Sequence, residues 1–456
     1  VSAIYGEKGG FAFLWVALGS AVAGSAIILR KPKNMRFYLR EGFVTVALSW
    51  ILMSVIGCLP FVINGDIPHF ADALFEMISG FTTTGATVVS DVEGLTKGSL
   101  FWRSFSHWIG GMGVLVFLLA IVPMAGGSHM NLMKAESPGP SVGKLVPKVR
   151  QTAQYLYIIY FALTMIEVIF LLFGGMNLFE ALTTSFGTAG TGGFAIWNDG
   201  FVSVSPYNQW VVTIFMLLFG VNFGFYFLIL TGKLRDALKF EEVRIYFIIV
   251  IAAAVFIFIN LRHFALYAPA EGIRQAFFQV ASIITTTGFA SADFNLWPET
   301  SRTILVLLMF IGACAGSTGG GIKVSRFIIA CKSFIKEIIS YLHPRSVKKI
   351  KIEGKPLEHE TLRATNVYFM TYMVIFAVSV LLVSIENKDL VTNFAAVAAT
   401  FNNIGPGLSL VGPMANFGHF TDFTKYILMF DMLAGRLEIF PMMLLFCPAV
   451  WKRRRA

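Results

Sequence analysis

Four short segments of the sequence combine threonine, asparagine and glycine in a way that suits the binding of a dehydrated cation. Glycine permits the backbone angles that turn carbonyl groups inward, and rings of carbonyl oxygens can replace the hydration shell of an ion. The segments recur about 100 residues apart, a period too long for a solenoid. In the fourth segment Gly407 competes with Gly405 for the matching position. The residues expected to line this ion filter are Thr83, Thr84, Gly85, Thr191, Gly192, Gly193, Thr286, Thr287, Gly288, Asn403, Ile404 and Gly405.

Each segment follows a short amphipathic stretch and lies between two long apolar stretches. The long helices are expected at 43–63, 100–122, 152–175, 207–230, 243–262, 302–340 (interrupted), 365–386 and 424–446, with short helices at 71–81, 178–188, 273–284 and 391–401. The C-terminal end of each short helix carries a partial negative charge, which would face the cation. Irregular backbone at membrane depth is tolerated where it is buried or lines a water-filled cavity.

These elements predict an all-α integral membrane protein. Four tandem helix–pore loop–helix repeats would surround one central pore with pseudo-fourfold symmetry, after one or more extra N-terminal helices. The extra region is expected at 1–41 and the repeats at 42–125, 126–235, 236–345 and 346–456. The sequence starts at Val1, so we expect residues upstream of it, and the first basic cluster follows its apolar run, unlike a signal peptide.

Composition excludes several classes of protein. Residues are 56% hydrophobic and 14% charged, whereas a soluble domain has about 25% charged residues. The net charge of +10 is interpreted as basic cytoplasmic loops and not as a nucleic-acid surface. Basic residues concentrate between the repeats and at residues 452–455, so we expect the inter-repeat loops and the C-terminus on the cytoplasmic side and the pore loops entering from outside. The four cysteines are not at metal-ligand spacing, and no catalytic set stands out, so no enzyme activity is expected.

A glycine-rich run inside the second helix of the third repeat is the first candidate gate. It comprises Gly316, Ser317, Thr318, Gly319, Gly320 and Gly321. Each glycine costs a helix about 1 kcal/mol relative to alanine, so we expect a flexible loop beneath the filter. A phosphate-binding loop is excluded because Ile322 precedes Lys323 and Val324 follows it. Close packing between helices is the other interpretation.

Arg436, expected within a closing helix over 426–446, is the second candidate gate. A charge at the centre of a spanning helix costs roughly 2.5–3.5 kcal/mol, so it should face a polar cavity, where it would raise the barrier to a cation. Glu438 is not expected to neutralise it, because residues two apart on a helix do not share a face. The alternative is a structural ion pair. Other charged residues are expected to anchor loops near the short helices: Asp72, Glu76, Arg103, Glu180 and Arg274.

Several motifs together resemble the Trk/Ktr/HKT superfamily of cation transport proteins, and within it the membrane subunits of bacterial Trk systems. They are residues 80–86 (GFTTTGA), 108–113 (WIGGMG), 135–140 (AESPGP), 285–289 (TTTGF), 316–323 (GSTGGGIK) and 435–438 (GRLE). The resemblance implies a homodimer with one pore per subunit, two extra N-terminal helices, and the glycine-rich loop as a gate. It also implies a TrkA-like cytosolic ring of nucleotide-binding RCK domains. ATP/ADP or NAD(H) would bind that partner, and this chain would hold K⁺ at the filter carbonyls without a cofactor.

The resemblance indicates potassium uptake across the bacterial inner membrane. Glycine at all four filter positions implies passage of K⁺ and Rb⁺. A serine at the first position is associated with Na⁺ preference, and Gly85 stands there. The divergent Asn402-Asn403 segment leaves the exclusion of Na⁺ open. The alternative to a channel-like pathway is a symporter coupled to H⁺ or Na⁺, for which Glu167 is the isolated intramembrane carboxyl group. A transporter of organic solutes built from inverted halves is disfavoured, because inversion would reverse the charge pattern of the loops.

Overall fold

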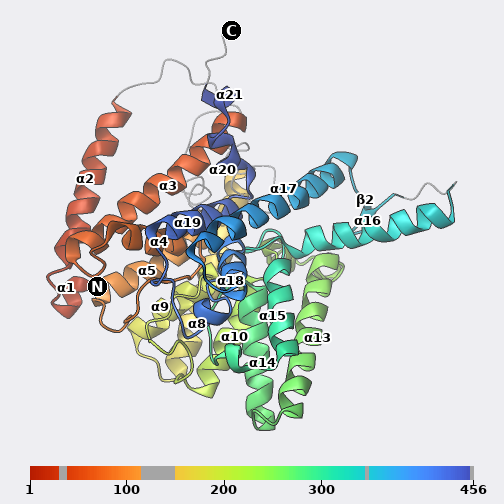
Figure 1. The fold of residues 1–456 in the computed structure, drawn as a ribbon, viewed down its shortest axis with the longest axis horizontal. Helices are drawn as coiled ribbons and strands as arrows, with labels where there is room; N and C mark the ends of the chain where they lie inside the picture. Colours follow the sequence, from red (N-terminus) through yellow and green to blue (C-terminus); the bar gives the residue numbers. More distant parts are fainter. Residues whose placement is uncertain (30–38, 114–148, 345–348, 452–456) are drawn as a thin grey trace.

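The structure is a computed structural model that describes residues 1–29, 39–113, 149–344 and 349–451. Two N-terminal helices, α1 (Ser2–Tyr5) and α2 (Gly10–Ile28), precede four helical units (Figure 1). The first two units contain α3 (Leu39–Asn64), α4 (Phe70–Phe81), α5 (Lys97–Gly111), α8 (Val149–Phe173), α9 (Leu178–Gly190), α10 (Pro206–Phe219), α11 (Phe223–Leu230) and α12 (Leu234–Leu238). The last two contain α13 (Glu241–His263), α14 (Pro269–Ile284), α15 (Glu299–Ile311), α16 (Val324–Leu342), α17 (His359–Val383), α18 (Leu390–Phe401), α19 (Asp422–Arg436), α20 (Phe440–Leu445) and α21 (Pro448–Trp451).

Two of the four short helices start at side-chain caps, and a third starts at a proline. Asn177 and Glu180 form a capping box at α9, and the Asp389 carboxylate accepts the Thr392 N–H at the start of α18 (2.9 Å). Such caps satisfy N–H groups that have no partner inside the helix. Pro269 occupies the first turn of α14, where its missing N–H costs nothing.

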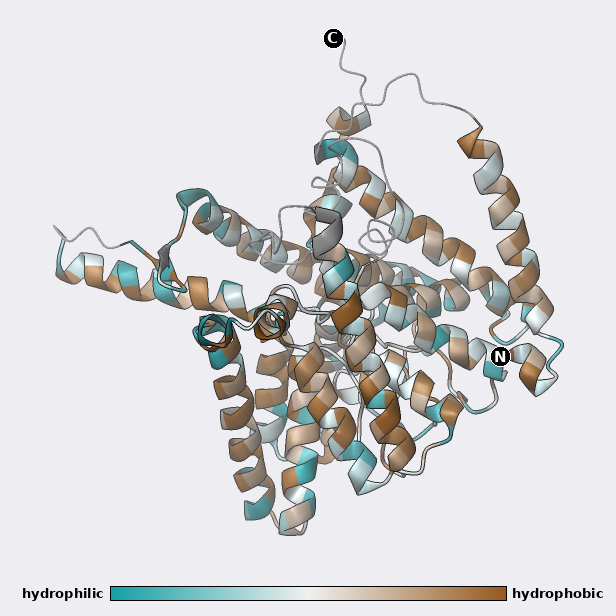
Figure 2. Cartoon of the chain, turned by 180° about the vertical axis from the view of Figure 1, so that it is seen from behind, coloured by the Kyte–Doolittle hydropathy of each residue, from teal (hydrophilic) through white to brown (hydrophobic). Residues whose placement is uncertain are grey.

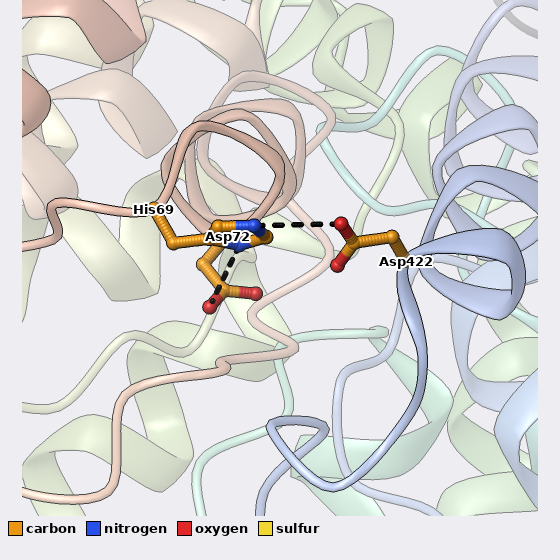
Figure 3. Close-up of side chains that lie close together, drawn as sticks. All are labelled: His69, Asp72 and Asp422. Carbon is orange, nitrogen blue, oxygen red and sulfur yellow. Dashed lines mark ion pairs between the residues drawn. The ribbon is translucent and has the colours of Figure 1, made fainter.

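The four units close into a ring. The helix that follows each filter loop packs against the short helix of the next unit: α5 on α9, α10 on α14, α15 on α18, and α19 on α4. At this last junction His69 lies between Asp72 and Asp422, with 3.4 Å from a ring nitrogen to each carboxylate (Figure 3). The Lys425 ammonium lies 2.5 Å from the Asp72 carboxylate. The first and fourth units are therefore joined by charged side chains at the start of α4 and of α19.

Apolar residues cover the outward faces of the long helices, and polar residues gather at their ends (Figure 2). Among the described residues, five helices are long and apolar enough to cross a membrane: Gly10–Ile28, Arg40–Asn64, Ala153–Phe173, Glu241–His263 and His359–Glu386. The bent pair α10–α11 makes a sixth if it counts as one span. The outward face is consistent with contact to lipid, because the bilayer core accommodates apolar side chains.

The helix expected at 100–122 already ends at Gly111, and two others of the expected long helices are broken. The stretch 207–230 ends one helix at Phe219 and bends by 89° before the next begins. Gly220 passes so close to the Tyr246 hydroxyl that a Cβ would lie 2.6 Å from it, and the Asn222 side chain caps α11 by accepting the Gly224 N–H (2.8 Å). The stretch 424–446 likewise breaks after Arg436, which is the last residue of α19 and not at the centre of a spanning helix.

The third unit contains the expected interruption, because α15 ends at Ile311 and α16 begins at Val324. A two-stranded hairpin, β1 (Lys351–Ile352) and β2 (Lys355–Pro356), was not expected. Its turn residues Glu353 and Gly354 both have positive φ, as a tight two-residue hairpin turn requires. Together the end of α16, the hairpin and the start of α17 project away from the other helices (Figure 1), while the rest of α17 packs against α18 and α19. The predictions for residues 114–122, 135–140 and 452–455 lie outside the described residues.

Candidate ion filter and gate

The four filter loops share one backbone conformation. In each loop the N–H one residue before the glycine donates to a carbonyl in the preceding short helix, at 2.8–2.9 Å. The residue two before the glycine also has positive φ, at 54–59°, and the glycine itself has φ between 76° and 95°. This holds for the divergent fourth loop too, where Asn403 has φ 55° and Gly405 has φ 95°. Gly405, and not Gly407, is therefore the equivalent of the other three glycines.

The glycines form a ring because each lies against a carbonyl group of the neighbouring loop. A Cβ on Gly85 would collide with the Gly192 carbonyl oxygen, and one on Gly193 with that of Thr287. A Cβ on Gly288 would collide with the Ile404 oxygen, and one on Gly405 would lie 2.7 Å from that of Thr84. Each of these carbonyls belongs to the residue before the next glycine. These four contacts link the loops, in sequence order, into a closed ring. The residues that the sequence predicts to line the filter therefore lie close together.

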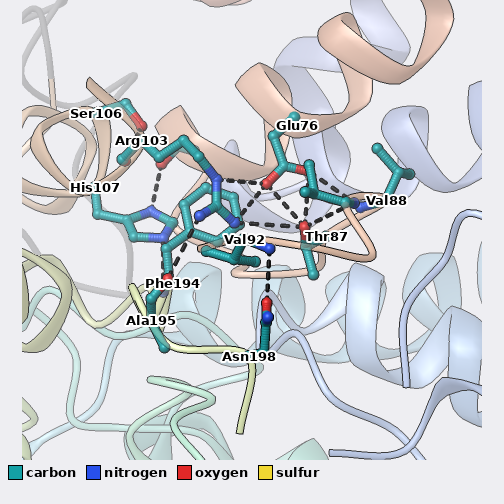
Figure 4. Close-up of polar contacts among 12 residues, drawn as sticks. Glu76, Thr87, Val88, Val92, Arg103, Ser106, His107, Phe194, Ala195 and Asn198 are labelled. Atoms are coloured by element: carbon teal, nitrogen blue, oxygen red, sulfur yellow. Dashed lines mark hydrogen bonds and ion pairs between the residues drawn. The ribbon is translucent and has the colours of Figure 1, made fainter. Parts of the chain in front are cut away.

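A pocket opens on the glycine side of this ring. Its floor is lined by Gly85, Gly193, Gly288 and Gly405, and its wall by the loops that follow them. One of these loops is held by Asn198, whose side chain donates to Asp91 at 2.9 Å and accepts the Val92 N–H at 2.7 Å (Figure 4). Hydrogen bonds from Asn198 and from the Gly94 N–H hold the pKa of Asp91 below its usual value. The mouth is thus built from interlocked loops of different units.

Side chains beneath the glycines are polar and buried. The Asn403 amide donates to the Thr84 hydroxyl and to the Met432 carbonyl, both at 2.9 Å. The Thr83 hydroxyl is buried without a hydrogen-bond partner. Buried polar atoms rarely remain unpaired, so the Thr83 hydroxyl is a candidate ligand at this place.

The glycine-rich segment 316–321 lies directly beneath the third and fourth filter loops. The Gly320 N–H donates to the Thr286 hydroxyl (2.6 Å), and a Cβ on Gly320 would lie 2.7 Å from the Asn402 carbonyl oxygen. A Cβ on Gly319 would lie 2.9 Å from the Thr285 carbonyl oxygen. Larger residues would not fit in this space, so the glycines serve close packing here, and the flexibility of the segment stays a prediction.

Glu242, at the start of α13, holds both ends of this segment, and sequence reasoning missed it. One carboxylate oxygen accepts the Ala315 N–H (2.7 Å) and the Ser325 N–H (3.0 Å). Glu242 and Ala315 are far apart in sequence, and nothing in the local pattern around Glu242 indicates the contact.

Arg436 joins three units through carbonyl groups. Its guanidinium donates to the carbonyls of Gly110 (2.5 Å) and Gly111 (2.8 Å), at the end of α5, and to the Thr318 carbonyl of the glycine-rich segment (2.8 Å). The last carbonyls of a helix lack intrahelical partners and carry partial negative charge, which favours a cation at this place. Arg436 therefore lies against the candidate gate loop, and its role as a gate stays a prediction.

Glu438 has an arginine of α16 as its ion-pair partner. It forms an ion pair with Arg326 of α16, whose guanidinium also lies over the Tyr368 ring, 3.8 Å from its centre. Lys323, buried at the end of the glycine-rich loop, donates to the Gly319 carbonyl. Several cationic side chains thus surround the gate loop.

The charged residues expected to anchor loops have partners that suit this role. Arg103 and Glu76 form a buried ion pair at 2.7 Å behind the first filter loop (Figure 4). The Glu76 carboxylate also accepts from the Thr87 hydroxyl (2.9 Å) and the Val88 N–H (3.1 Å). Arg274 donates to the Gln209 side chain at 2.8 Å. The Arg103–Glu76 pair fixes the first loop just beyond its glycine.

We expect Arg103→Leu to destabilise the protein by about 3–5 kcal/mol, because it leaves a buried carboxylate without its cation. The double variant Glu76→Gln/Arg103→Leu removes that charge and should recover most of the loss. Thermal unfolding of the detergent-purified variants measures both effects. Equal losses in the single and the double variant would contradict this account of the pair.

Two further carboxyl groups, besides those of Glu76 and Glu242, lie buried within the helices. Glu167 in α8 has 0% exposure, and neither of its oxygens has a hydrogen-bond partner. Asp431 in α19 accepts from the Ser379 hydroxyl at 2.7 Å through one oxygen only. Ionisable residues at this depth mark functional sites more often than not.

A closed ring of four helix–loop–helix units, with carbonyl-rich loops at its centre and an apolar exterior, defines a multi-pass membrane protein built to pass cations. The family model described as TrkH, cation transport protein, matches residues 11–453. The chain therefore belongs to the TrkH family, and the resemblance drawn from its motifs is confirmed.

Relatives match the chain over nearly its full length. The Trk system potassium uptake protein TrkH of Escherichia coli K12 is 37% identical over 465 residues, covering 99% of this chain and 94% of the relative. The TrkH of Vibrio parahaemolyticus is 38% identical over 421 residues (91% and 86%), and the E. coli TrkG is 32% identical over 460 residues (99% and 94%). The crystal structure of the potassium transporter TrkH from V. parahaemolyticus superposes with a TM-score of 0.88 at 33% identity, covering 99% of this chain and 94% of that one. The predicted fold class is confirmed.

Proposed function

We propose that this protein takes up K⁺ across the bacterial inner membrane by channel-like conduction through the four filter loops. The observation that carries the proposal is the closed ring in which each filter glycine abuts the carbonyl preceding the next glycine. Such a ring offers oxygens from four sides to a dehydrated cation. The relatives are named potassium uptake proteins, which favours K⁺ as the ion. Rb⁺ would follow the same path, and Na⁺ would pass less readily.

In this proposal the glycine-rich segment and Arg436 close the pore below the filter. The Thr318 carbonyl and the carbonyls at the end of α5 hold the guanidinium there, and a positive charge on the path repels a cation. The pore loops would face outward, and the basic inter-repeat segments the cytoplasm, as the positive-inside rule suggests. A homodimer would bind a TrkA-like RCK ring, which would carry the regulatory nucleotide. The projecting arm of α16, the hairpin and α17 leads directly from the glycine-rich segment (Figure 1) and suits such control.

A symporter coupled to H⁺ or Na⁺ is the second candidate. The buried and unpartnered Glu167 carboxyl group supports it, because coupling needs a second site that binds an ion or a proton. Glu167 lies outside the ring of filter loops, on α8.

Purified protein reconstituted alone into liposomes tests the proposal, with K⁺, Rb⁺, Na⁺ and Li⁺ fluxes driven only by a K⁺ gradient. We expect K⁺ and Rb⁺ flux without any coupling ion, and protein-free liposomes give the baseline. Flux that requires a Na⁺ or H⁺ gradient would favour the symporter. If no flux appears under any gradient until a cytosolic RCK partner is added, that partner is required for conduction.

A further inference from the structure

One helix behind the filter differs from its three counterparts. Aligned on their N-cap residues, α5, α10, α15 and α19 share a pair of positions one helical turn apart that are almost fully buried in every unit. Three units place apolar residues there, and the first unit places an arginine and a histidine. The pairs are Arg103 and His107, Val212 and Met216, Leu305 and Met309, and Leu428 and Met432.

His107 uses both ring nitrogens to link two elements of the filter. Its Nδ1 lies 2.7 Å from the Gly80 carbonyl oxygen in the first short helix, and its Nε2 lies 3.2 Å from the Phe194 N–H in the second filter loop (Figure 4). The carbonyl needs a donor and the N–H needs an acceptor, so these partners require the neutral ring with its proton on Nδ1. The ring also fills the space where Gly192 would carry a Cβ.

Arg103 holds the same loop one turn away. Its guanidinium lies over the Phe194 ring, 4.1 Å from its centre, and donates weakly to the Ala195 carbonyl (3.4 Å). Phe194 directly follows the filter glycine Gly193. The second loop is therefore bonded to the first unit by directional contacts, whereas the other three junctions present only methionine and aliphatic side chains at these positions, which adapt to their surroundings.

We propose that His107 is a positioning residue that sets ion selectivity, because it fixes the second filter loop against the first short helix. Gly80 precedes the first filter loop and Phe194 follows the glycine of the second, and these two loops meet where Gly85 abuts the Gly192 carbonyl. A ring held at a defined width favours the ion that fits its oxygens, and a ring free to contract admits a smaller one. The inference rests on the proposed conduction through this filter.

His107→Met tests the inference, since it installs the residue that the other three units carry at this position. We expect the K⁺/Na⁺ permeability ratio to fall about fivefold or more, the scale of losing one or two buried hydrogen bonds, while K⁺ flux persists. The ratio of Rb⁺ to Na⁺ uptake into liposomes that contain the variant measures this. Because the same folded molecules carry both ions, the ratio of Rb⁺ to Na⁺ uptake does not depend on the fraction of the variant that folds.

Two further variants separate positioning from packing. His107→Gln keeps one donor and one acceptor and should retain a ratio closer to that of the unmodified protein than His107→Met does. Met309→Leu makes a similar change of packing at the equivalent position of the third unit and should leave the ratio unchanged. A His107→Met ratio equal to that of the unmodified protein, or a loss shared by Met309→Leu, would overturn the inference. If the unmodified protein carries no K⁺, with or without a partner, the proposed function fails first.

Discussion

Replacing Arg436 with alanine should raise K⁺ flux through the reconstituted protein by at least about tenfold. Two unit charges 4 Å apart repel by about 4 kcal/mol at an effective dielectric constant of 20, and each 1.4 kcal/mol of barrier is about tenfold in rate. The guanidinium donates to the Thr318 carbonyl of the glycine-rich segment and to carbonyls at the end of α5. Its loss would remove a positive charge and also release the segment that lies under the filter.

Two companion variants separate these effects. Arg436→Lys keeps the charge and loses the fork of donors that reaches several carbonyls at once, and Arg436→Gln keeps hydrogen bonding and loses the charge. If charge dominates, glutamine should raise flux nearly as much as alanine, and lysine should stay near the unmodified protein. If the hydrogen bonds dominate, lysine should raise flux and glutamine should stay closer to the unmodified protein. Unchanged flux in all three variants would show that Arg436 is a structural residue and not a gate.

The sequence was informative where function constrains residue types over short stretches. The four loops were recognisable because glycine and threonine recur between apolar stretches, and the break between α15 and α16 because a glycine run opposes a helix. The equivalence of Gly405 was left open, since the fourth loop differs in composition. The backbone decides it: the angles of Asn403 and Gly405 repeat those of Thr83 and Gly85.

The breaks near residues 220 and 438 escaped prediction for a physical reason. Around residue 220 apolar character continues across the break, so hydropathy gives no signal there. The other break falls beside Arg436 and Glu438, whose charges were interpreted as lying within one continuous helix. The breaks coincide with close contacts to other units, such as the close approach of Gly220 to the Tyr246 hydroxyl. The same limit hid the roles of Glu242 and His107. Their partners, Ala315 and Phe194, are distant in the sequence, and a single sequence does not encode such pairs visibly.

Gly288→Ala should abolish K⁺ flux, with a loss of about 100-fold or more, equivalent to nearly 3 kcal/mol of added barrier. The new Cβ would collide with the Ile404 carbonyl oxygen and lie 3.0 Å from Cδ of Pro406. The Ile404 carbonyl oxygen belongs to the backbone, so no change of side-chain rotamer can relieve this collision. This carbonyl is also one of the oxygens that would bind the ion, so the collision would displace a ligand of the filter.

Gly175→Ala is the matched control, because it separates backbone strain from the collision. Gly175 has φ 86° and Gly288 has φ 84°, so alanine incurs a similar cost of about 1–2 kcal/mol for a left-handed conformation at either place. A Cβ on Gly175 meets nothing within 4 Å. We therefore expect Gly175→Ala to lower the unfolding temperature slightly and to keep full Rb⁺ uptake per folded protein. If Gly288→Ala keeps as much Rb⁺ uptake as Gly175→Ala, the ring of glycines does not line the path of the ion.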